Sequence, residues 1–386
     1  MSTRKTVFLI GNAHLDPVWL WRWQEGCAEV RNTCRAAAGF IDEFPGFVFT
    51  RSSAGDMRWI EETEPGLFKT IQQHARAGHW SNAGGWWTQP DCTIPCGESF
   101  VRQGLYGQAF FKERLGHPSL FGYNVDSFGH NAGLPQILRK SGMPYYVFMR
   151  PAPYENRSVP EGYFRWRGID GSEVLAFRVF SPYATWSVKQ LKEQLDRLRA
   201  HMEKTGTDSI MLFYGVGNHG GGPTREQLNE LERLRSDPEM PDLVYASCAD
   251  AFARCEAEGR ELPVFTGDLH HHASGCYAAQ TEVKEMNRRC EEALLAAERT
   301  AAVCTALTGR AYPHARIEAA WHDLLFNQFH DILSGSSVRE ACRDTRDQLG
   351  RACFTAEEAL NASVQALASR IDTRGTGTAF ILFNPH

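Results

Sequence analysis

Short apolar runs alternate with longer amphipathic stretches along the first two thirds of the chain. The run TVFLIGN at residues 6–12 is stopped by Gly-Asn, which is typical of a strand buried in a parallel sheet. Residues 187–204 instead carry apolar side chains at helical spacing. Repeated strand, loop and helix predict an α/β fold, with functional residues on loops at the carboxyl ends of the strands. Further strands are predicted at 47–53, 119–126, 144–150, 173–180 and 209–217, and a further helix at 99–116.

The pattern changes after about residue 265, where long helices replace the alternation. Two helices are predicted at 282–309 and 315–335, and a third by apolar residues at every third or fourth position from Leu349 to Ile371. A polar stretch then leads into FILFNPH, which reads as the start of a strand. The predicted division is an α/β domain at 1–265, a three-helix bundle at 266–372 and the start of a further β domain at 373–386.

Composition and charge narrow the class of protein. A net charge of −5 with 42 % hydrophobic residues excludes a disordered or fibrous chain. No basic stripe is present, so a nucleic-acid partner is not expected. The apolar runs are too short to cross a bilayer, and the one near the N-terminus is too short for a signal peptide. We therefore expect a cytoplasmic protein that does not bind membranes, and a homo-oligomer is left open.

The cysteines fit the same compartment. There are eleven, an odd number, and no Cys-x-x-Cys occurs. We interpret them as reduced, mostly buried small apolar residues. A metal site at Cys92 and Cys96 is the weaker alternative, because a thiolate zinc site needs a second nearby pair.

Two histidine-containing segments are candidates for metal binding. His14 and Asp16 directly follow the first predicted strand, and residues at i and i+2 of an extended segment point the same way. Both could therefore face one metal ion, although a loop with a capping aspartate explains the same pattern. The tract His270-His271-His272 is less suitable, because adjacent side chains on a strand point to opposite faces.

Carboxylates at the ends of other elements are candidates for catalysis. Asp126 comes where the strand predicted at 119–126 ends, a position that suits a rigidly held catalytic group and equally a helix N-cap. His330 and Asp331 lie near the end of the helix predicted at 315–335. A histidine there can complement the helix dipole, whereas an acid is disfavoured.

Two loops suggest a ligand. The glycine-rich segment 215–224 lacks the Gly-Lys-Ser/Thr ending of a phosphate loop and the spacing of a dinucleotide site, so its glycines are better explained by close approach to the backbone. Trp86 and Trp87 precede Asp91, a combination that suits stacking and hydrogen bonding to a sugar. A buried aromatic patch is the alternative.

Taken together, three of these segments resemble glycoside hydrolase family 38, the α-mannosidases, in its intracellular bacterial type. They are HLDPVW at 14–19, VDSFGHNAGLPQIL at 125–138 and FHDILSGSS at 329–337. The resemblance implies a seven-stranded parallel β/α barrel-like domain followed by a three-helix domain. It also implies one zinc ion, with cobalt as an alternative. The implied metal ligands are His14, Asp16, Asp126 and His330.

The same resemblance implies an activity and the residues for it. The family's enzymes remove terminal α-mannosyl residues from mannosides or oligosaccharides with retention, and Asp126 would be the nucleophile. Trp19 would stack beneath the sugar ring, Arg150 would bond the nucleophile, and Asp331 would hold sugar hydroxyls. Asp91 is a further candidate for substrate binding.

The chain departs from the family at the general acid. The family has an aspartate just after the strand that matches 209–217, whereas this chain has Asn218-His219. An asparagine cannot exchange a proton at neutral pH, whereas a histidine can. Either His219 is the acid/base, or Asp91 takes the role, or activity is reduced.

Two other functions are kept as alternatives. A metal-dependent deacetylase of the polysaccharide type also uses His and Asp ligands at strand ends, but its metal activates water and no sugar becomes bound to the enzyme. A sugar-binding remnant without turnover is favoured by Asn218. Members of the family also continue into large β domains. The segment FILFNPH resembles the first residues of that region.

Overall fold

The apolar run at residues 6–12 forms the central strand of a parallel sheet, as predicted. The structure is a computed structural model that describes residues 5–179 and 181–384. Strand β1 (Thr6–Ala13) is buried from Val7 onward, which fits a strand covered on both faces. It pairs in parallel with β2, β8 and β9, and β3 pairs with β2. The bounds are β2 (Phe49–Ser52), β3 (Trp80–Ala83), β8 (Ser209–Tyr214) and β9 (Asp242–Tyr245).

A second sheet of five strands has the order β10-β6-β7-β5-β4. The two sheets meet where the N–H of Gly84, after β3, donates to the carbonyl of Phe121 in β4 at 3.1 Å. Strands β6 and β7 are antiparallel, which departs from the all-parallel order that the expected barrel requires. The described residues thus form two sheets, and the expected closed seven-stranded barrel is not found. The bounds are β4 (Phe121–Asn124), β5 (Tyr145–Phe148), β6 (Gly162–Arg167), β7 (Glu173–Arg178) and β10 (Val264–Thr266).

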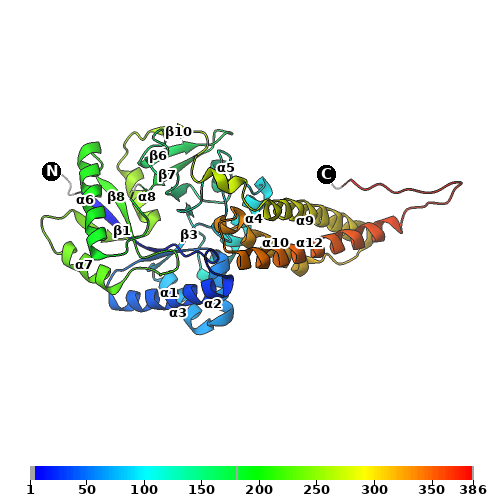
Figure 1. Cartoon of the computed structure of the whole chain (residues 1–386), viewed down its shortest axis with the longest axis horizontal. Helices are drawn as coiled ribbons and strands as arrows, with labels where there is room; N and C mark the ends of the chain where they lie inside the picture. Colours follow the sequence, from blue (N-terminus) through cyan, green and yellow to red (C-terminus); the bar gives the residue numbers. More distant parts are fainter. Residues whose placement is uncertain (1–4, 180, 385–386) are drawn as a thin grey trace.

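Helices follow most of the strands and cover the sheets (Figure 1). Helix α6 (Val188–Thr205) shows why: Leu191, Leu195, Leu198 and Met202 are buried along one face, while lysine and glutamate occupy the other. The Ser187 side chain accepts from the N–H of Gln190 and caps its start. The others are α1 (Trp23–Glu43), α2 (Ala54–Thr63), α3 (Pro65–Arg76), α4 (Gly97–Phe110), α5 (Leu134–Lys140), α7 (Arg225–Arg235) and α8 (Cys248–Ala257).

Three long helices project from the α/β part and pack side by side (Figure 1). Leu294, Trp321 and Leu349, one from each helix, belong to the same buried apolar cluster as Ile10 of β1. The hydrophobic core is therefore continuous between the two parts of the molecule, while the domain boundary at residue 265 stays a prediction. The bounds are α9 (Thr281–Thr308), α10 (His314–Asn327) and α12 (Arg339–Ala368).

The helix predicted at 315–335 is interrupted. Helix α10 ends at Asn327, and a separate short helix α11 (His330–Leu333) follows. The break is stabilised by long-range hydrogen bonds, because Gln328 donates to Ser99, Asn287 and Glu291, whose side chains are buried with it. His330 therefore begins a helix instead of lying near the end of one.

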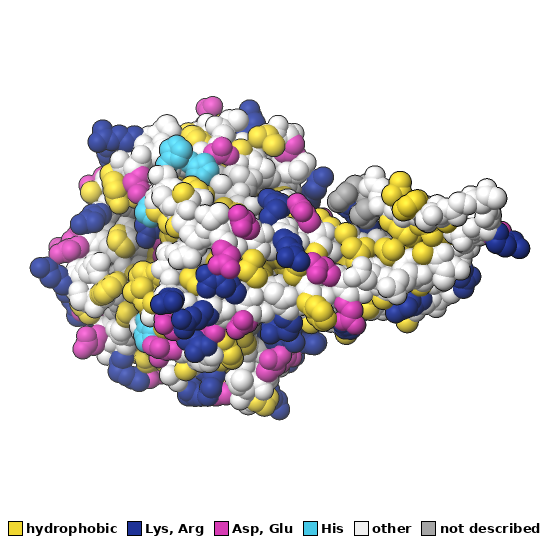
Figure 2. Space-filling view, turned by 45° about the vertical axis from the view of Figure 1, so that its right-hand side comes forward, with side chains coloured by type: hydrophobic (Ala, Val, Ile, Leu, Met, Phe, Trp, Pro, Cys, Tyr) yellow, Lys and Arg dark blue, Asp and Glu magenta, His cyan; other side chains and the backbone are white. Residues whose placement is uncertain are grey.

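The far end of the three helices exposes apolar side chains (Figure 2). Surfaces of this kind are typical of places that other protein segments cover. The strand expected at FILFNPH is not formed in the described residues up to 384, because no neighbouring strand pairs with it. Among the described residues no helix is long and apolar enough to span a membrane. The exposed apolar residues at this end are Val303, Leu307 and Ile371.

Candidate metal centre and active site

Four of the predicted site residues meet at the carboxyl ends of the strands. His14 and Asp16 follow β1, Asp126 follows β4, and His330 opens α11. One ligand atom from each lies within 4.8 Å of the other three, and all four residues are buried. No other group of His, Cys, Asp or Glu in the described ranges has this geometry. The predicted cluster is therefore assembled from distant parts of the chain.

The atoms that face each other lack hydrogen-bond partners. His14 Nε2 lies 2.9 Å from Asp16 Oδ1 and 3.7 Å from Asp126 Oδ2, and His330 Nε2 lies 3.7 Å from Asp16 Oδ1. None of His14 Nε2, Asp16 Oδ1 and His330 Nε2 makes a hydrogen bond of good geometry. Burying such atoms unpaired is costly. Two imidazole nitrogens and two carboxylates are a donor set that a divalent cation satisfies.

The charges in this cluster depend on each other. Burial alone would raise the pKa of Asp16, but the neighbouring His14 and His330 outweigh it and lower that pKa well below its usual range. Burial alone would lower the pKa of His330, but Asp16, Asp331 and Asp126 raise it to about 9. The protonated His330 thus places a positive charge beside the carboxylates of the cluster, as a metal ion would.

Asp126 is oriented by two further side chains. Arg150, after β5, donates from Nε to Oδ1, and Tyr183, after β7, donates its hydroxyl to Oδ2 at 3.2 Å. Burial lowers the pKa of Arg150, but Asp126 outweighs it, so the net pKa is raised and the pair stays charged. The Arg150 contact matches the prediction, whereas Tyr183 was missed because nothing in its local sequence marks it.

Asn218 and His219 lie at the mouth of the site. The Asn218 backbone is left-handed, with φ +54°, and its Oδ1 lies 2.7 Å from the Tyr183 hydroxyl oxygen, so it shares the single proton of that hydroxyl with Asp126 Oδ2. His219 Nε2 lies 2.6 Å from Glu25 Oε1, its ring packs on Trp21 at 4.5 Å, and 41 % of its side chain is exposed. Asn218 thus connects to the Asp126 carboxylate through one hydroxyl, while His219 is open to solvent.

Trp19 and Asp91, two of the predicted substrate-binding residues, lie outside the metal cluster. The ring of Trp19 is half-buried and packs on Trp21 at 5.8 Å. Asp91 is buried and its Oδ1 accepts from the N–H groups of Thr93 and Ile94, both at 2.8 Å. Burial raises the pKa of Asp91 above its usual range.

Asp331 adjoins the cluster. Its Oδ1 accepts from the Ser336 hydroxyl at 2.5 Å, and its Oδ2 lies 3.7 Å from His330 Nε2. Burial raises the pKa of Asp331 to about 7. One oxygen of this carboxylate is therefore fixed by the protein and the other faces the metal ligands.

Several other predicted features resolve into structural roles. Trp86 and Trp87 are buried, and Trp86 donates to Asn124 at 2.8 Å, so the aromatic pair belongs to the core. A side chain at Gly215 would place its Cβ 2.0 Å from the carbonyl of Asn12, which supports close backbone approach in the glycine-rich loop. His272 contacts Glu155 at 2.5 Å. All eleven cysteines are free thiols.

Gln89 contacts both histidines and was missed by the sequence analysis. Its side-chain Nε2 lies 3.1 Å from His14 Nδ1, and its main-chain carbonyl lies 2.9 Å from His330 Nδ1. The only local signal is its position between the tryptophan pair and Asp91. The sequence analysis interpreted that segment through Trp86, Trp87 and Asp91 and assigned no role to Gln89. One residue therefore supports ligands that lie at opposite ends of the chain.

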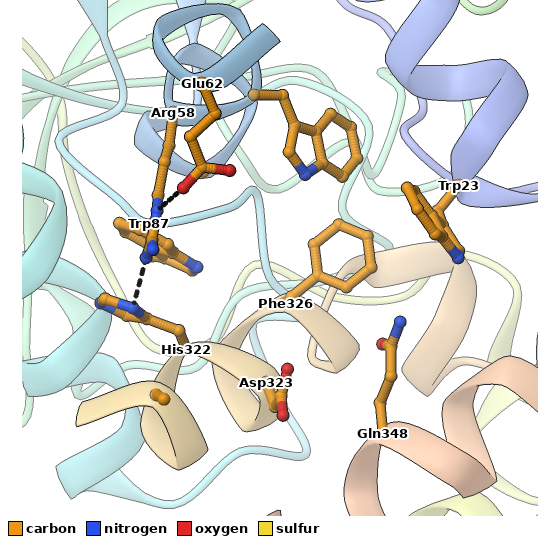
Figure 3. Close-up of a pocket in the computed structure, with 11 residues that line it drawn as sticks. Trp23, Arg58, Glu62, Trp87, His322, Asp323, Phe326 and Gln348 are labelled. Atoms are coloured by element: carbon orange, nitrogen blue, oxygen red, sulfur yellow. Dashed lines mark hydrogen bonds and ion pairs between the residues drawn. The ribbon is translucent and has the colours of Figure 1, made fainter. Parts of the chain in front are cut away.

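A cavity of about 310 Å³ opens beside this segment, between α2 and α10 (Figure 3). The ring of His322 stacks on the Trp87 indole at 3.9 Å with only 5° between the planes. Arg58 lies against the same indole, and its Nη1 is 3.0 Å from His322 Nδ1. Asp323 and Gln348 also line the cavity. None of the four clustered ligands lines this cavity. Trp87 forms one of its walls and fixes the position of the segment that leads to Gln89.

Comparisons with known proteins agree with this architecture. Residues 4–272 match the family model described as the glycosyl hydrolases family 38 N-terminal domain, and residues 271–367 match the alpha mannosidase middle domain. Alpha-mannosidase 2C1 of Homo sapiens is 30 % identical over 88 % of this chain, and Alpha-mannosidase G of Dictyostelium discoideum is 31 % identical over 89 %. The crystal structure of an alpha-mannosidase from Enterococcus faecalis superimposes with a TM-score of 0.85 over 96 % of this chain, at 21 % identity.

These relatives are much longer than the chain. It spans about a third of the two curated relatives, 33 % and 32 % of their lengths, and 43 % of the Enterococcus faecalis protein.

Proposed function

The chain belongs to glycosyl hydrolase family 38, and from that membership we propose that it carries the catalytic centre of a metal-dependent α-mannosidase. Its substrate is a terminal α-D-mannosyl residue of a mannoside or oligosaccharide, cleaved with retention of configuration. The observation that carries the proposal is the group of three buried, unpaired ligand atoms on His14, Asp16 and His330, next to the carboxylate of Asp126. The free cysteines support a reducing, cytoplasmic setting.

Zinc is the ion that suits this donor set best. Imidazole nitrogen and carboxylate oxygen are ordinary zinc ligands, and cobalt accepts the same set. His14, Asp16, Asp126 and His330 would hold the ion. When bound, a divalent cation orients the sugar hydroxyls and offsets negative charge near the reacting carbon.

Asp126 is the proposed nucleophile. Arg150 and Tyr183 each bond a different oxygen of its carboxylate, so its orientation is fixed before substrate arrives. An Asp126 oxygen attacks the anomeric carbon as the bond to the leaving oxygen breaks, and the departing group takes a proton from the acid. Water, deprotonated by the same group, then releases the sugar, and two displacements at one carbon retain its configuration.

His219 is the proposed acid/base. Its side chain is 41 % exposed, so a leaving group and water can reach it, and Glu25 fixes one of its nitrogens at 2.6 Å. Asp91 suits the role less, because two backbone N–H groups already hold one of its oxygens and it is buried. Asn218 occupies the neighbouring position that bonds Tyr183, and it cannot donate a proton from an acidic group. Trp19 and the free oxygen of Asp331 are assigned to the sugar.

Hydrolysis of an aryl α-mannoside tests the proposal. The purified chain is assayed as prepared, after chelation, and after zinc is restored, and we expect activity to follow zinc. Incubation with a 2-deoxy-2-fluoro mannosyl fluoride, followed by peptide mass spectrometry, is expected to label Asp126. Activity on acetylated saccharides without such labelling would support the deacetylase instead. Bound zinc and bound mannose without turnover would support a sugar-binding protein.

A further inference from the structure

The last histidine of the tract His270-His271-His272 lies at the edge of the candidate active site. The His272 ring is 5.5 Å from the ring of Phe128, and the Phe128 ring is in turn 5.8 Å from the ring of His330. Phe128 follows Asp126 by two residues in the chain. A single aromatic ring therefore separates His272 from a proposed metal ligand.

Glu155 fixes the position of His272. Its Oε1 lies 2.5 Å from His272 Nδ1, and its Oε2 accepts from the N–H of Ala152 at 2.6 Å. The next residue, Asn156, donates from its side chain to the main-chain carbonyl of His270. The loop between β5 and β6 is thus attached by two side chains to the segment that carries His272.

The same loop begins close to the nucleophile. Arg150, five residues before Glu155, donates from Nε to Asp126 Oδ1. Burial alone would raise the pKa of Glu155, but the N–H of Ala152 and the neighbouring His272 outweigh it, so the net pKa is lowered. Arg150 acts in the same direction. Glu155 therefore stays a carboxylate near the guanidinium that orients Asp126.

The second nitrogen of His272 is available to a ligand. Nδ1 faces a carboxylate, which only accepts, so Nδ1 carries a proton and Nε2 of the neutral ring has a lone pair. Within residues 5–179 and 181–384 no group bonds this Nε2, and 18 % of the His272 side chain is exposed. A hydroxyl group suits such a nitrogen, because it donates to the neutral ring and accepts from the protonated one.

We propose that His272, fixed by Glu155, is a specificity-determining residue that bonds a hydroxyl group of the leaving saccharide. The inference rests on the proposed α-mannosidase activity, which assigns the terminal mannose to the ion, Trp19 and Asp331. A side chain that lies beyond Phe128 from the metal ligands meets the part of the substrate that follows this mannose.

Two histidines that are each fixed by a glutamate thus lie on different sides of Asp126. His219 follows the residue that shares the Tyr183 hydroxyl with Asp126 Oδ2. His272 lies on the side of Arg150, which bonds Asp126 Oδ1. Proton transfer to the glycosidic oxygen and recognition of the leaving saccharide are therefore assigned to separate residues.

Steady-state kinetics of the full chain on two substrates test the inference. An aryl α-mannoside has no second sugar, whereas an α-linked mannobiose has hydroxyl groups for His272 to bond. For His272→Ala we expect the ratio of kcat/KM on the mannobiose to kcat/KM on the aryl mannoside to fall by about 3- to 10-fold, the effect of one hydrogen bond, with most of the loss in KM. His314→Ala is the matched control, because it removes a histidine that also faces a glutamate, Glu318 at 3.6 Å, but at the exposed start of α10.

Further variants separate binding from support. His272→Gln keeps a hydrogen-bonding group and is expected to recover part of the ratio. Glu155→Ala is expected to lower the ratio as His272→Ala does, and the double variant to fall no further, because the two side chains act as a unit. An unchanged ratio in His272→Ala, an equal fall on both substrates, additive losses in the double variant, or the same fall in His314→Ala would each overturn the inference. A wild-type chain that is inactive on the aryl mannoside would instead refute the proposed function, and the inference with it.

Discussion

Replacing His330 with alanine provides the sharpest test of the metal centre. The side chain is fully buried, its Nε2 lies 3.7 Å from Asp16, and its Nδ1 bonds the carbonyl of Gln89. His330→Ala therefore removes one of four ligand atoms and leaves the other three in place on the α/β part. We expect the variant to fold, because alanine is tolerated at the start of a short helix, but to bind zinc weakly.

The magnitude follows from binding linkage. Zinc at 100 times its dissociation constant stabilises the native chain by about 2.7 kcal/mol. If loss of one ligand weakens binding by about 100-fold, the same zinc concentration equals the new dissociation constant and stabilises by only about 0.4 kcal/mol. The expected difference is thus about 2.3 kcal/mol in zinc-induced stabilisation, apart from any change in the metal-free protein.

Urea unfolding, followed by tryptophan fluorescence with and without zinc, measures this difference. His74→Ala is the control, since it removes a buried histidine of α3 that lies 3.6 Å from Asp42, away from the cluster. Elemental analysis of the purified proteins gives an independent count of bound metal. Equal zinc-induced shifts in wild type and His330→Ala, with equal metal content, would refute the role of His330 as a ligand.

Three further predictions concern catalysis and stability. Asp126→Asn keeps the size of the nucleophile and is expected to lower mannoside hydrolysis by about 10³-fold or more with little change in circular dichroism; retained turnover would exclude Asp126 as the nucleophile. His219→Ala is expected to slow hydrolysis, with partial rescue by azide; an unchanged rate would move the acid role elsewhere. Burial and the neighbouring Arg58 lower the pKa of His322 to about 4. Because the unfolded chain binds this proton from about pH 6.5 downward, stability should fall on acidification between pH 6.5 and 4, by about 2 kcal/mol at pH 5. His322→Phe, which keeps a ring on Trp87, should lose that part of the pH dependence, as urea unfolding at pH 5 and 8 would measure.

The sequence predicted the elements whose local pattern is strong. Strand β1 and helix α6 lie within a residue or so of their predicted bounds, because a continuous apolar run and a regular apolar face identify them. The short strands β3, β9 and β10 were missed, since three or four residues carry too little pattern. The strand order was not predictable either, because it depends on pairings between distant segments.

The site residues likewise fall into those that the sequence could predict and those that it could not. His14, Asp16, Asp126 and His330 could be named in advance because motifs surround them, and the structure brings them together. Gln89 and Tyr183 could not, because they act through contacts with residues far away in the sequence. The break between α10 and α11 has the same origin. Buried partners of Gln328 terminate a helix that the local apolar spacing would continue.

The origin of the ligands has a consequence for how the protein is made. His14 and Asp16 leave the ribosome among the first residues, whereas His330 emerges only after the whole α/β part and helices α9 and α10. A complete ion-binding pocket cannot exist before the helical part has docked. Once captured, the ion ties the two ends of a long chain segment together, and closing so long a loop restricts the unfolded chain strongly. Loading with metal therefore reports completed assembly, and a nascent or truncated chain that lacks α11 should release the ion to any competing chelator.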